Sequence, residues 1–205
     1  TSMVEKKASD VHMKAGARPL FRLAVTLFLI AASALWTGAN AQFSSKTSGQ
    51  GTSVVTTPYV RAELLALAPQ GVAPGQPLWL GLSITHQPEW HTYWKNPGDS
   101  GLPTHLAWTL PAGLDAGEIA WPLPRKIPIG TLANYGYEGT VLLPVPVTVA
   151  NSFAPGPLAK NVTIQLRASW LVCRKECIPE DGEFTLQLPI QSTTALNGAA
   201  FEAAA

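Results

Sequence analysis

Clusters of proline and glycine divide most of this 205-residue chain into short segments. The clusters lie at 74–77, 96–98, 111–113 and 155–157. After residue 41, no segment has the apolar repeat of a long amphipathic helix, whereas short and often alternating segments recur between the clusters. These segments predict β-strands at 59–67, 78–85, 104–110, 140–149, 162–171 and 183–188.

The segment 162–171 has the plainest strand pattern. Val162, Ile164, Leu166 and Ala168 lie on one face of an extended chain, and polar side chains alternate with them on the other face. This two-residue repeat is typical of a strand with one buried face. The spacing of strands and turns favours an all-β domain, an immunoglobulin-like antiparallel β-sandwich.

The beginning of the chain has the composition of an export signal. Basic residues at 14, 18 and 22 precede an apolar run over 23–36, and the small-residue pattern Ala39-Asn40-Ala41 precedes Gln42. A permanent transmembrane anchor is the alternative, but a run of about 14 residues is shorter than the ~20 that span a bilayer. We therefore expect residues 1–41 to be a signal peptide with an upstream extension.

The rest of the chain divides into three parts by composition. Residues 42–57 are rich in Ser, Thr and Gly and predict a flexible leader, 58–190 predict the folded domain, and the Ala-rich stretch 191–205 predicts a linker. After residue 41 we count nine Lys and Arg against eleven Asp and Glu. This balance provides no basic field to hold nucleic acid or an anionic membrane surface.

Cys173 and Cys177 are the only cysteines, and three residues separate them. In one extended strand their Cα atoms would be about 13 Å apart, four steps of ~3.3 Å. A disulfide needs Cα atoms within ~7 Å. Bonding therefore requires the chain to turn at Arg174, Lys175 and Glu176, which places three charged side chains at an exposed tip.

Three interpretations of this pair remain open: thiol–disulfide exchange, a structural disulfide and a metal site. A disulfide here closes a loop of about five residues, which contributes only roughly 2 kcal/mol in chain-entropy terms. Arg174 and Lys175 also favour the thiolate over the thiol at the neighbouring cysteines. These arguments favour exchange over a structural disulfide in a binding module without redox function.

The metal interpretation depends on which other ligands the chain offers. Copper sites combine thiolates with imidazole and often methionine, but no methionine follows Gln42 and no histidine follows Cys177. This composition excludes a blue-copper or binuclear copper centre of the usual kind. Two thiolates with one distant histidine, taken from His86, His91 or His105, remain the copper-binding or copper-tolerance alternative. A single cysteine pair is a weak match to structural zinc, so we expect no cofactor and no metal site.

Aromatic residues gather just before one of the predicted turns. Trp90 and Trp94 flank His91, Thr92 and Tyr93 and lead directly into the turn at 96–98. Aromatic side chains beside a loop are expected to wall a site. Motifs of other catalytic classes are missing, among them a phosphate-binding loop, a nucleophile elbow, a zinc-protease helix and the Cys-x-x-Cys of thioredoxin-like proteins.

Three segments together resemble a known family. They are His-Thr-Tyr-Trp-Lys-Asn-Pro-Gly-Asp-Ser-Gly at 91–101, Asn-Tyr-Gly-Tyr-Glu-Gly at 134–139 followed by Leu-Leu-Pro at 142–144, and Trp-Leu-Val-Cys to Cys-Ile-Pro at 170–179. In this order they are similar to the amino-terminal periplasmic domain of the DsbD and ScsB transmembrane reductases. The resemblance covers roughly 58–189. Three residues separate the cysteines here, whereas five separate them in the best-known members, and the shorter spacing suggests the ScsB-like branch.

The resemblance implies roles for individual residues. Cys177 would form the mixed disulfide with partner proteins, and Cys173 would resolve it. A cap loop with an aromatic shield would map to Asn134, Tyr135, Gly136, Tyr137 and Glu138, with the two tyrosines as candidates for the shield. The neighbours expected around the site are His91, Tyr93, Trp94, Asp99, Arg174 and Lys175.

The resemblance also implies partners and a location. The cysteine pair would receive electrons from the membrane-embedded and thioredoxin-like domains of the same reductase. It would pass them to oxidised thioredoxin-like or disulfide isomerase-like proteins, on the periplasmic side of the bacterial inner membrane. This chain has no second long apolar segment and no thioredoxin-like segment, so it is either the amino-terminal piece of a longer protein or a separately encoded domain. We prefer the first, in which 191–205 lead towards the membrane domain.

Overall fold

Two antiparallel sheets enclose the hydrophobic core in the computed structural model, which describes residues 51–204. The first sheet has the strand order β1-β2-β3-β9-β6. Its strands are β1 (Val54–Thr56), β2 (Val60–Leu67), β3 (Leu78–His86), β6 (Leu114–Ala116) and β9 (Thr140–Val149). The predicted signal peptide and most of the predicted leader lie outside the described residues.

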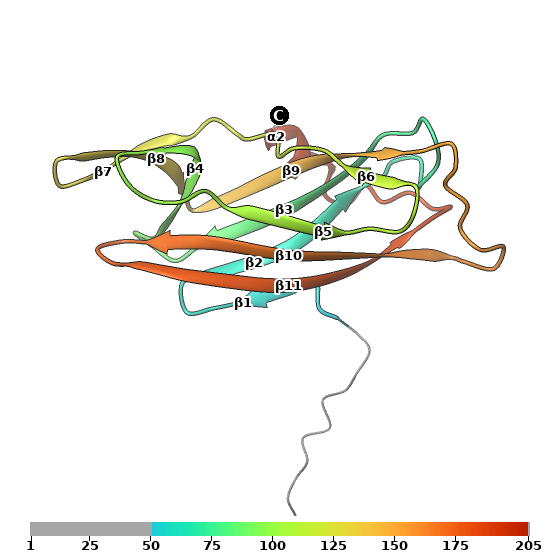
Figure 1. Ribbon diagram of the computed structural model, residues 1–205, viewed down its shortest axis with the longest axis horizontal. Coiled ribbons are helices and arrows are strands. Elements are labelled where there is room, and N and C mark those ends of the chain that lie inside the picture. Colours follow the sequence, from blue (N-terminus) through green and yellow to red (C-terminus); the bar gives the residue numbers. More distant parts are fainter. Residues whose placement is uncertain (1–50, 205) are drawn as a thin grey trace, which may run out of the picture. The chain divides into compact units, whose positions relative to one another are not determined.

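The second sheet has the order β11-β10-β4-β8-β7, and β5 also pairs with β10. Its strands are β4 (His91–Gly98), β5 (His105–Thr109), β7 (Arg125–Ile129), β8 (Leu132–Glu138), β10 (Asn161–Cys173) and β11 (Cys177–Pro189). Figure 1 shows β10 and β11 as one long hairpin, with the β7–β8 hairpin and β4 near its turn. The prediction of an all-β, immunoglobulin-like antiparallel sandwich is confirmed.

Alternating side chains explain why these segments become strands. On β10, Val162, Ile164, Leu166 and Ala168 are buried, and each residue between them is exposed. On β2, Val60, Ala62, Leu64 and Ala66 are buried in the same alternation. The inward side chains of both sheets form one apolar cluster. Burial of this cluster is the main free-energy gain that opposes the chain's conformational entropy.

The six predicted strands form, although several are longer than predicted. The strand predicted at 183–188 begins at Cys177, and the strand predicted at 162–171 reaches Cys173. Strands β1, β4, β6, β7 and β8 were not predicted. Because β4 contains Pro97 and β8 contains Gly136, their sequences resemble turns more than strands.

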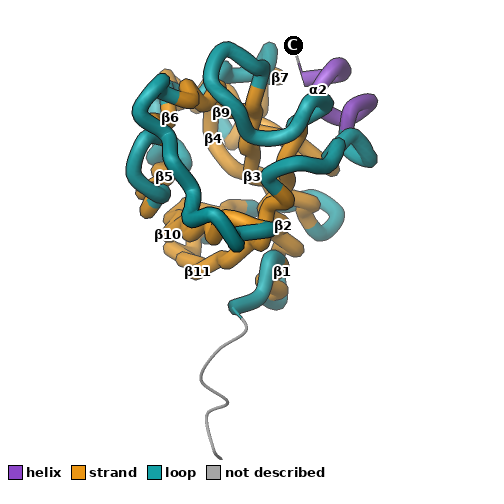
Figure 2. Tube along the Cα trace, turned by 90° about the vertical axis from the view of Figure 1, so that its right-hand side faces the viewer, coloured by secondary structure: helices purple, strands orange, loops and turns teal. Residues whose placement is uncertain are grey.

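Both ends of the predicted domain differ from the sequence expectation. Residues 54–56 of the predicted leader form β1, which pairs with β2. The predicted linker contains the short helix α2 (Gly198–Ala204), whose Phe201 is buried. Figure 2 shows α2 outside the layers of strands, near the C-terminal end. One aromatic anchor therefore docks an alanine-rich segment against the sheet. None of the helices in 51–204 is long and apolar enough to cross a membrane.

Close backbone approach between β4 and β8 gives a stability prediction. A Cβ atom at the buried Gly136 would overlap the carbonyl oxygen of Thr92, whereas a Cβ at the exposed Gly156 would meet nothing within 4 Å. We expect Gly136→Ala to lower the free energy of unfolding by about 2 kcal/mol or more, because two paired strands must separate. The matched variant Gly156→Ala should change it by less than about 0.5 kcal/mol. Urea denaturation measures both, and equal effects would contradict the strand pairing.

Candidate active site

A disulfide joins Cys173 and Cys177 across the end of the β10–β11 hairpin. Antiparallel pairing runs without interruption from Asn161 opposite Pro189 to Cys173 opposite Cys177, and the two cysteine Cα atoms are 4.1 Å apart. Within the turn, the Arg174 amide donates to the Glu176 carbonyl at 3.0 Å. The predicted turn of three exposed charged residues is confirmed.

The two sulfur-bearing residues differ in exposure. Cys173 is 1% exposed, whereas Cys177 is exposed. Cys173 is on β10, which lies between β11 and β4, and it pairs with His91 of β4, while Cys177 is on β11 at the edge of the sheet. An incoming thiolate can therefore approach Cys177 much more easily than Cys173.

Tyr93 of β4 contacts the exposed cysteine. Its hydroxyl lies 3.7 Å from Cys177 Sγ, within hydrogen-bonding distance for sulfur. His91, two residues earlier on the same face of β4, places Nε2 3.4 Å from that hydroxyl, and the two rings meet edge to face. Both side chains are buried. The sequence placed His91 and Tyr93 near the site, and the structure brings them together with Cys177.

Burial shapes the acid–base properties of these two side chains. Burial lowers the pKa of His91, and the charge of Glu138, opposite it on β8, partly opposes this shift. Burial raises the pKa of Tyr93, which the Ser100 side chain partly opposes. At neutral pH, Tyr93 is therefore a hydroxyl donor and His91 a neutral imidazole.

The loop that follows β4 packs against the Tyr93 ring. A Cβ atom at Gly101, where φ is 101°, would overlap the Tyr93 ring, so only glycine fits there without displacement. Asn134 of β8 holds the loop, because its Oδ1 accepts from the Ser100 amide at 2.9 Å and from the Ser100 hydroxyl at 3.0 Å. Asp99 accepts from the Ala133 amide at 2.7 Å. The segments 91–101 and 134–139 thus meet around one tyrosine.

The predicted cap loop is a strand. Residues 134–138 belong to β8, which pairs with β4 on one side and β7 on the other. Tyr137 is buried in the core, and its hydroxyl donates to the Pro122 carbonyl at 2.8 Å. Tyr135 is 38% exposed. The expectation of a loop was wrong because the pairing of Gly136 beside Thr92 depends on a distant segment; the shielding role of this segment stays a prediction.

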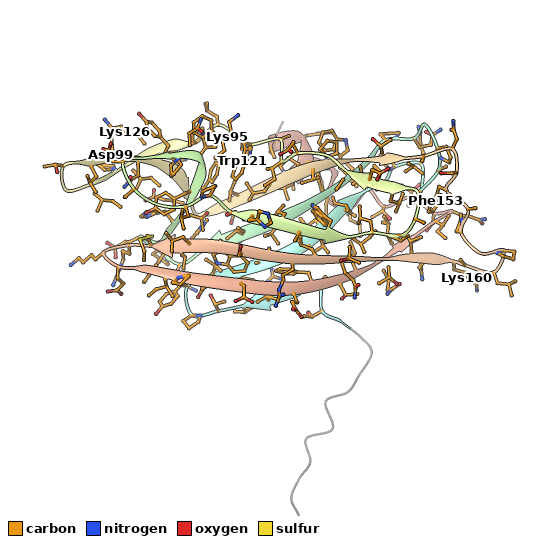
Figure 3. The ribbon with its side chains drawn as sticks, viewed as in Figure 1. Lys95, Asp99, Trp121, Lys126, Phe153 and Lys160 are labelled. Atoms are coloured by element: carbon orange, nitrogen blue, oxygen red, sulfur yellow. A yellow bond between two sulfur atoms is a disulfide. The ribbon has the colours of Figure 1, made fainter. Side chains whose placement is uncertain are left out.

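The remaining predicted neighbours are Arg174 and Lys175 in the hairpin turn, and Trp94 and Asp99 outside it. The Arg174 guanidinium lies 3.3 Å from a Glu89 carboxylate oxygen and 5.4 Å from the centre of the Trp90 ring. Glu89 has a φ of 69°, the only positive value among the non-glycine residues described. Trp94 is half-buried against the core, and Lys175 is exposed. Figure 3 places Lys95, Asp99 and Lys126 at the same end of the sheet as the tip.

The predicted histidines do not assemble with the cysteines as a ligand set. His86 is buried, with Nδ1 2.7 Å from the Gly139 carbonyl and Nε2 2.9 Å from the Thr92 hydroxyl. His105 is exposed on β5. Within residues 51–204, no group of three or more His, Cys, Asp or Glu side chains is arranged to hold a metal ion. Cys177 Sγ is instead a disulfide sulfur that contacts the Tyr93 hydroxyl, with the His91 imidazole beyond that hydroxyl.

Comparison with known proteins gives one family. The family described as thiol:disulfide interchange protein DsbD, N-terminal, matches residues 61–189. Among solved structures, the N-terminal periplasmic domain of ScsB from Proteus mirabilis is similar, with a TM-score of 0.55 and 19% identity over 76% of this chain. This chain spans 58% of that structure's length. A yeast GGA1 GAE domain gives a TM-score of 0.32 and 13% identity, over 66% of this chain and 96% of that domain. A search of curated proteins found no match.

The buried His86 predicts a pH-dependent stability. Burial lowers its pKa from 6.5 to about 4, while a hydrogen bond to the Gly139 carbonyl opposes this and the charge of His91 adds to it. Between pH 6.5 and 4 the unfolded chain therefore binds more protons than the folded chain. The contribution of neutral His86 to the free energy of unfolding is fully present above pH 6.5 and is lost as the pH decreases towards 4. At 1.36 kcal/mol per unit of pKa, the loss is about 3 kcal/mol.

Urea denaturation from pH 7.5 to 4 measures this loss. The variant His86→Gln should have a flatter profile than the wild type, and His105→Gln, at an exposed position, should retain the wild-type slope. A slope that His86→Gln leaves unchanged would show that another group titrates.

Proposed function

Because this chain belongs to the family of DsbD N-terminal domains, a family of thiol–disulfide exchange domains, we propose that it reduces the disulfides of thioredoxin-like proteins through Cys177. In the reduced state Cys177 is the attacking thiol and Cys173 the resolving one. Electrons reach the pair from the membrane-embedded and thioredoxin-like domains of the same reductase. The chain acts on the periplasmic side of the inner membrane after export.

The observation that carries this proposal is the unequal exposure of the two cysteines. Exchange requires a linear approach of the attacking sulfur to the sulfur attacked, so access decides which cysteine reacts. Cys177 is exposed at the sheet edge, and Cys173 is buried on β10, between β11 and β4. A purely structural disulfide has no need of this difference. The small loop that it closes also stabilises little.

The exchange proceeds in two balanced steps. The Cys177 thiolate attacks the partner's disulfide, forming an intermolecular S–S bond and releasing one partner sulfur, which takes up a proton. The Cys173 thiolate then attacks Cys177 Sγ, forming the intramolecular disulfide and releasing the second partner sulfur. Two electrons pass to the partner, and the two cysteines of this chain are oxidised.

Exposed apolar side chains on β8 and after β4, two strands at the end of the sheet where the cysteine hairpin turns (Figure 1), provide a contact surface for such a partner. Tyr135 and Leu132 on β8, together with Leu102 after the loop at 98–101, are exposed. Exposed apolar side chains close to a reactive group are typical of protein-binding surfaces. Lys175 and Glu176 at the tip add charges that select among partners.

Trapping the mixed disulfide tests the proposal. We expect Cys173→Ala, which keeps only Cys177, to form a 1:1 covalent adduct with a thioredoxin whose single remaining cysteine is activated as a thionitrobenzoate mixed disulfide. Release of thionitrobenzoate, read by absorbance, should be roughly 100-fold slower for Cys177→Ala, because the remaining thiol is buried.

The double variant with both cysteines changed to Ser is the matched control and should form no adduct. If both single variants react equally fast, the assignment of Cys177 is wrong. If neither reacts while both remain folded, the exchange function itself is wrong, and the disulfide is structural.

A further inference from the structure

Three polar groups form a line from the protein surface into the sheet. Cys177 Sγ, at the exposed end, lies 3.7 Å from the Tyr93 hydroxyl, and that hydroxyl lies 3.4 Å from His91 Nε2. Tyr93 and His91 are 1% and 2% exposed. Because Tyr93 and His91 are buried, a proton that leaves the Cys177 thiol on the Tyr93 side has a protein group as its nearest acceptor.

Other side chains limit how His91 can be used. Glu138 on β8 and Cys173 on β10 lie opposite His91 in the two neighbouring strands. His86 on β3 interacts with His91 by charge and is itself engaged by the Gly139 carbonyl and the Thr92 hydroxyl. Arg174, the nearest cation in sequence to Cys173, is directed to Glu89 and Trp90. Among the residues described, His91 is therefore the base that Tyr93 reaches.

We propose that His91 is a positioning residue that holds the proton of the Cys177 thiol, passed to it through the Tyr93 hydroxyl. The inference rests on the proposed exchange function and adds the group that activates its nucleophile. It assigns Tyr93, which contacts the sulfur, as the group that transfers the proton.

Two protons move in the proposed transfer. In the reduced domain, the Cys177 thiol gives its proton to the Tyr93 oxygen while Tyr93 gives its own to Nε2 of His91, in the tautomer with Nδ1 protonated. The result is a Cys177 thiolate hydrogen-bonded to Tyr93 and a His91 imidazolium facing Glu138. The thiolate then attacks the disulfide of a thioredoxin-like protein. The partner sulfur that is released takes up one proton, and the imidazolium of His91 can return the proton it holds.

The pH dependence follows from the same line of groups. Burial lowers the pKa of His91, so the imidazole is neutral at pH 7 and has an unprotonated nitrogen, and the negative charges of Glu138 and of the Cys177 thiolate stabilise the imidazolium that forms. When the pH falls far enough to protonate His91 from solvent, the thiol loses its acceptor and the thiolate fraction drops. At alkaline pH the thiol ionises without help, so the advantage that His91 provides disappears.

The rate of Cys177 alkylation measures this advantage. The full chain carrying Cys173→Ala is treated with iodoacetamide from pH 5 to 10, with and without His91→Gln. We expect His91→Gln to slow alkylation roughly tenfold at pH 7, equivalent to raising the thiol pKa by about one unit, and to have no effect near pH 10. His105→Gln, at an exposed histidine, should leave the profile unchanged.

Two further variants separate proton holding from packing. Tyr93→Phe should raise the pH midpoint of Cys177 alkylation as His91→Gln does. The variant that carries both substitutions should have the same midpoint as either single variant, because both changes break one path. A slowing by the same factor at every pH would overturn the proposal and leave His91 as a packing residue, and a wild-type profile in His91→Gln would overturn it as well.

An NMR titration of the wild-type chain tests the inference even if His91→Gln does not fold. The His91 ring is followed by NMR through a pH titration of the reduced wild-type chain, before and after carbamidomethylation of Cys177. Blocking the thiol removes the thiolate that stabilises the imidazolium, so the His91 midpoint should move to lower pH. An unchanged midpoint would overturn the inference. If the covalent adduct of Cys177 still forms in that case, the exchange function stands and only the role of His91 fails.

Discussion

The continuous pairing of β10 with β11 is the constraint on which the site depends. Thirteen residue pairs run from Asn161 opposite Pro189 to Cys173 opposite Cys177, with no register shift between them. A slip of one residue would turn every inward side chain of β10 outward, so the buried apolar face fixes the register. The same register that buries Ile164 and Leu166 therefore sets the positions of both sulfur atoms.

The second strand partner of β10 makes the two cysteines unequal. His91 of β4 pairs with the buried Cys173, while Tyr93 of the same strand contacts the exposed Cys177. Strand β4 is in turn held by β8, where Gly136 allows close approach and Asn134 holds the loop at 98–101. The three segments that resembled one family are far apart in the sequence, and they meet at a single buried tyrosine. Their convergence is what a thiol–disulfide exchange site requires: one accessible sulfur in a preorganised polar surrounding.

Sequence patterns predicted the parts of the fold that depend on local alternation. The buried faces of β2 and β10 follow a two-residue repeat, and the turn between the cysteines follows from the reach of a disulfide. Strands β4 and β8 escaped prediction because Pro97, Gly98 and Gly136 resemble turn residues until their partner strand is known. For the same reason, the sequence did not show which of the three tyrosines expected near the sulfur atoms contacts Cys177; in the structure it is Tyr93. The docking of α2 through Phe201 also depends on a distant sheet, which an alanine-rich segment does not reveal.

Redox titration measures directly whether Cys173 and Cys177 switch reversibly between the disulfide and the two free thiols. The folded chain is equilibrated in dithiol–disulfide buffers of graded potential, and the fraction of free thiols is read by alkylation and mass spectrometry. If the pair exchanges with partner proteins, we expect one reversible two-electron transition with a midpoint between about −270 and −120 mV, the range of thioredoxin-family couples. A pair that stays bonded to potentials below about −300 mV, or that opens only when the chain unfolds, would contradict it.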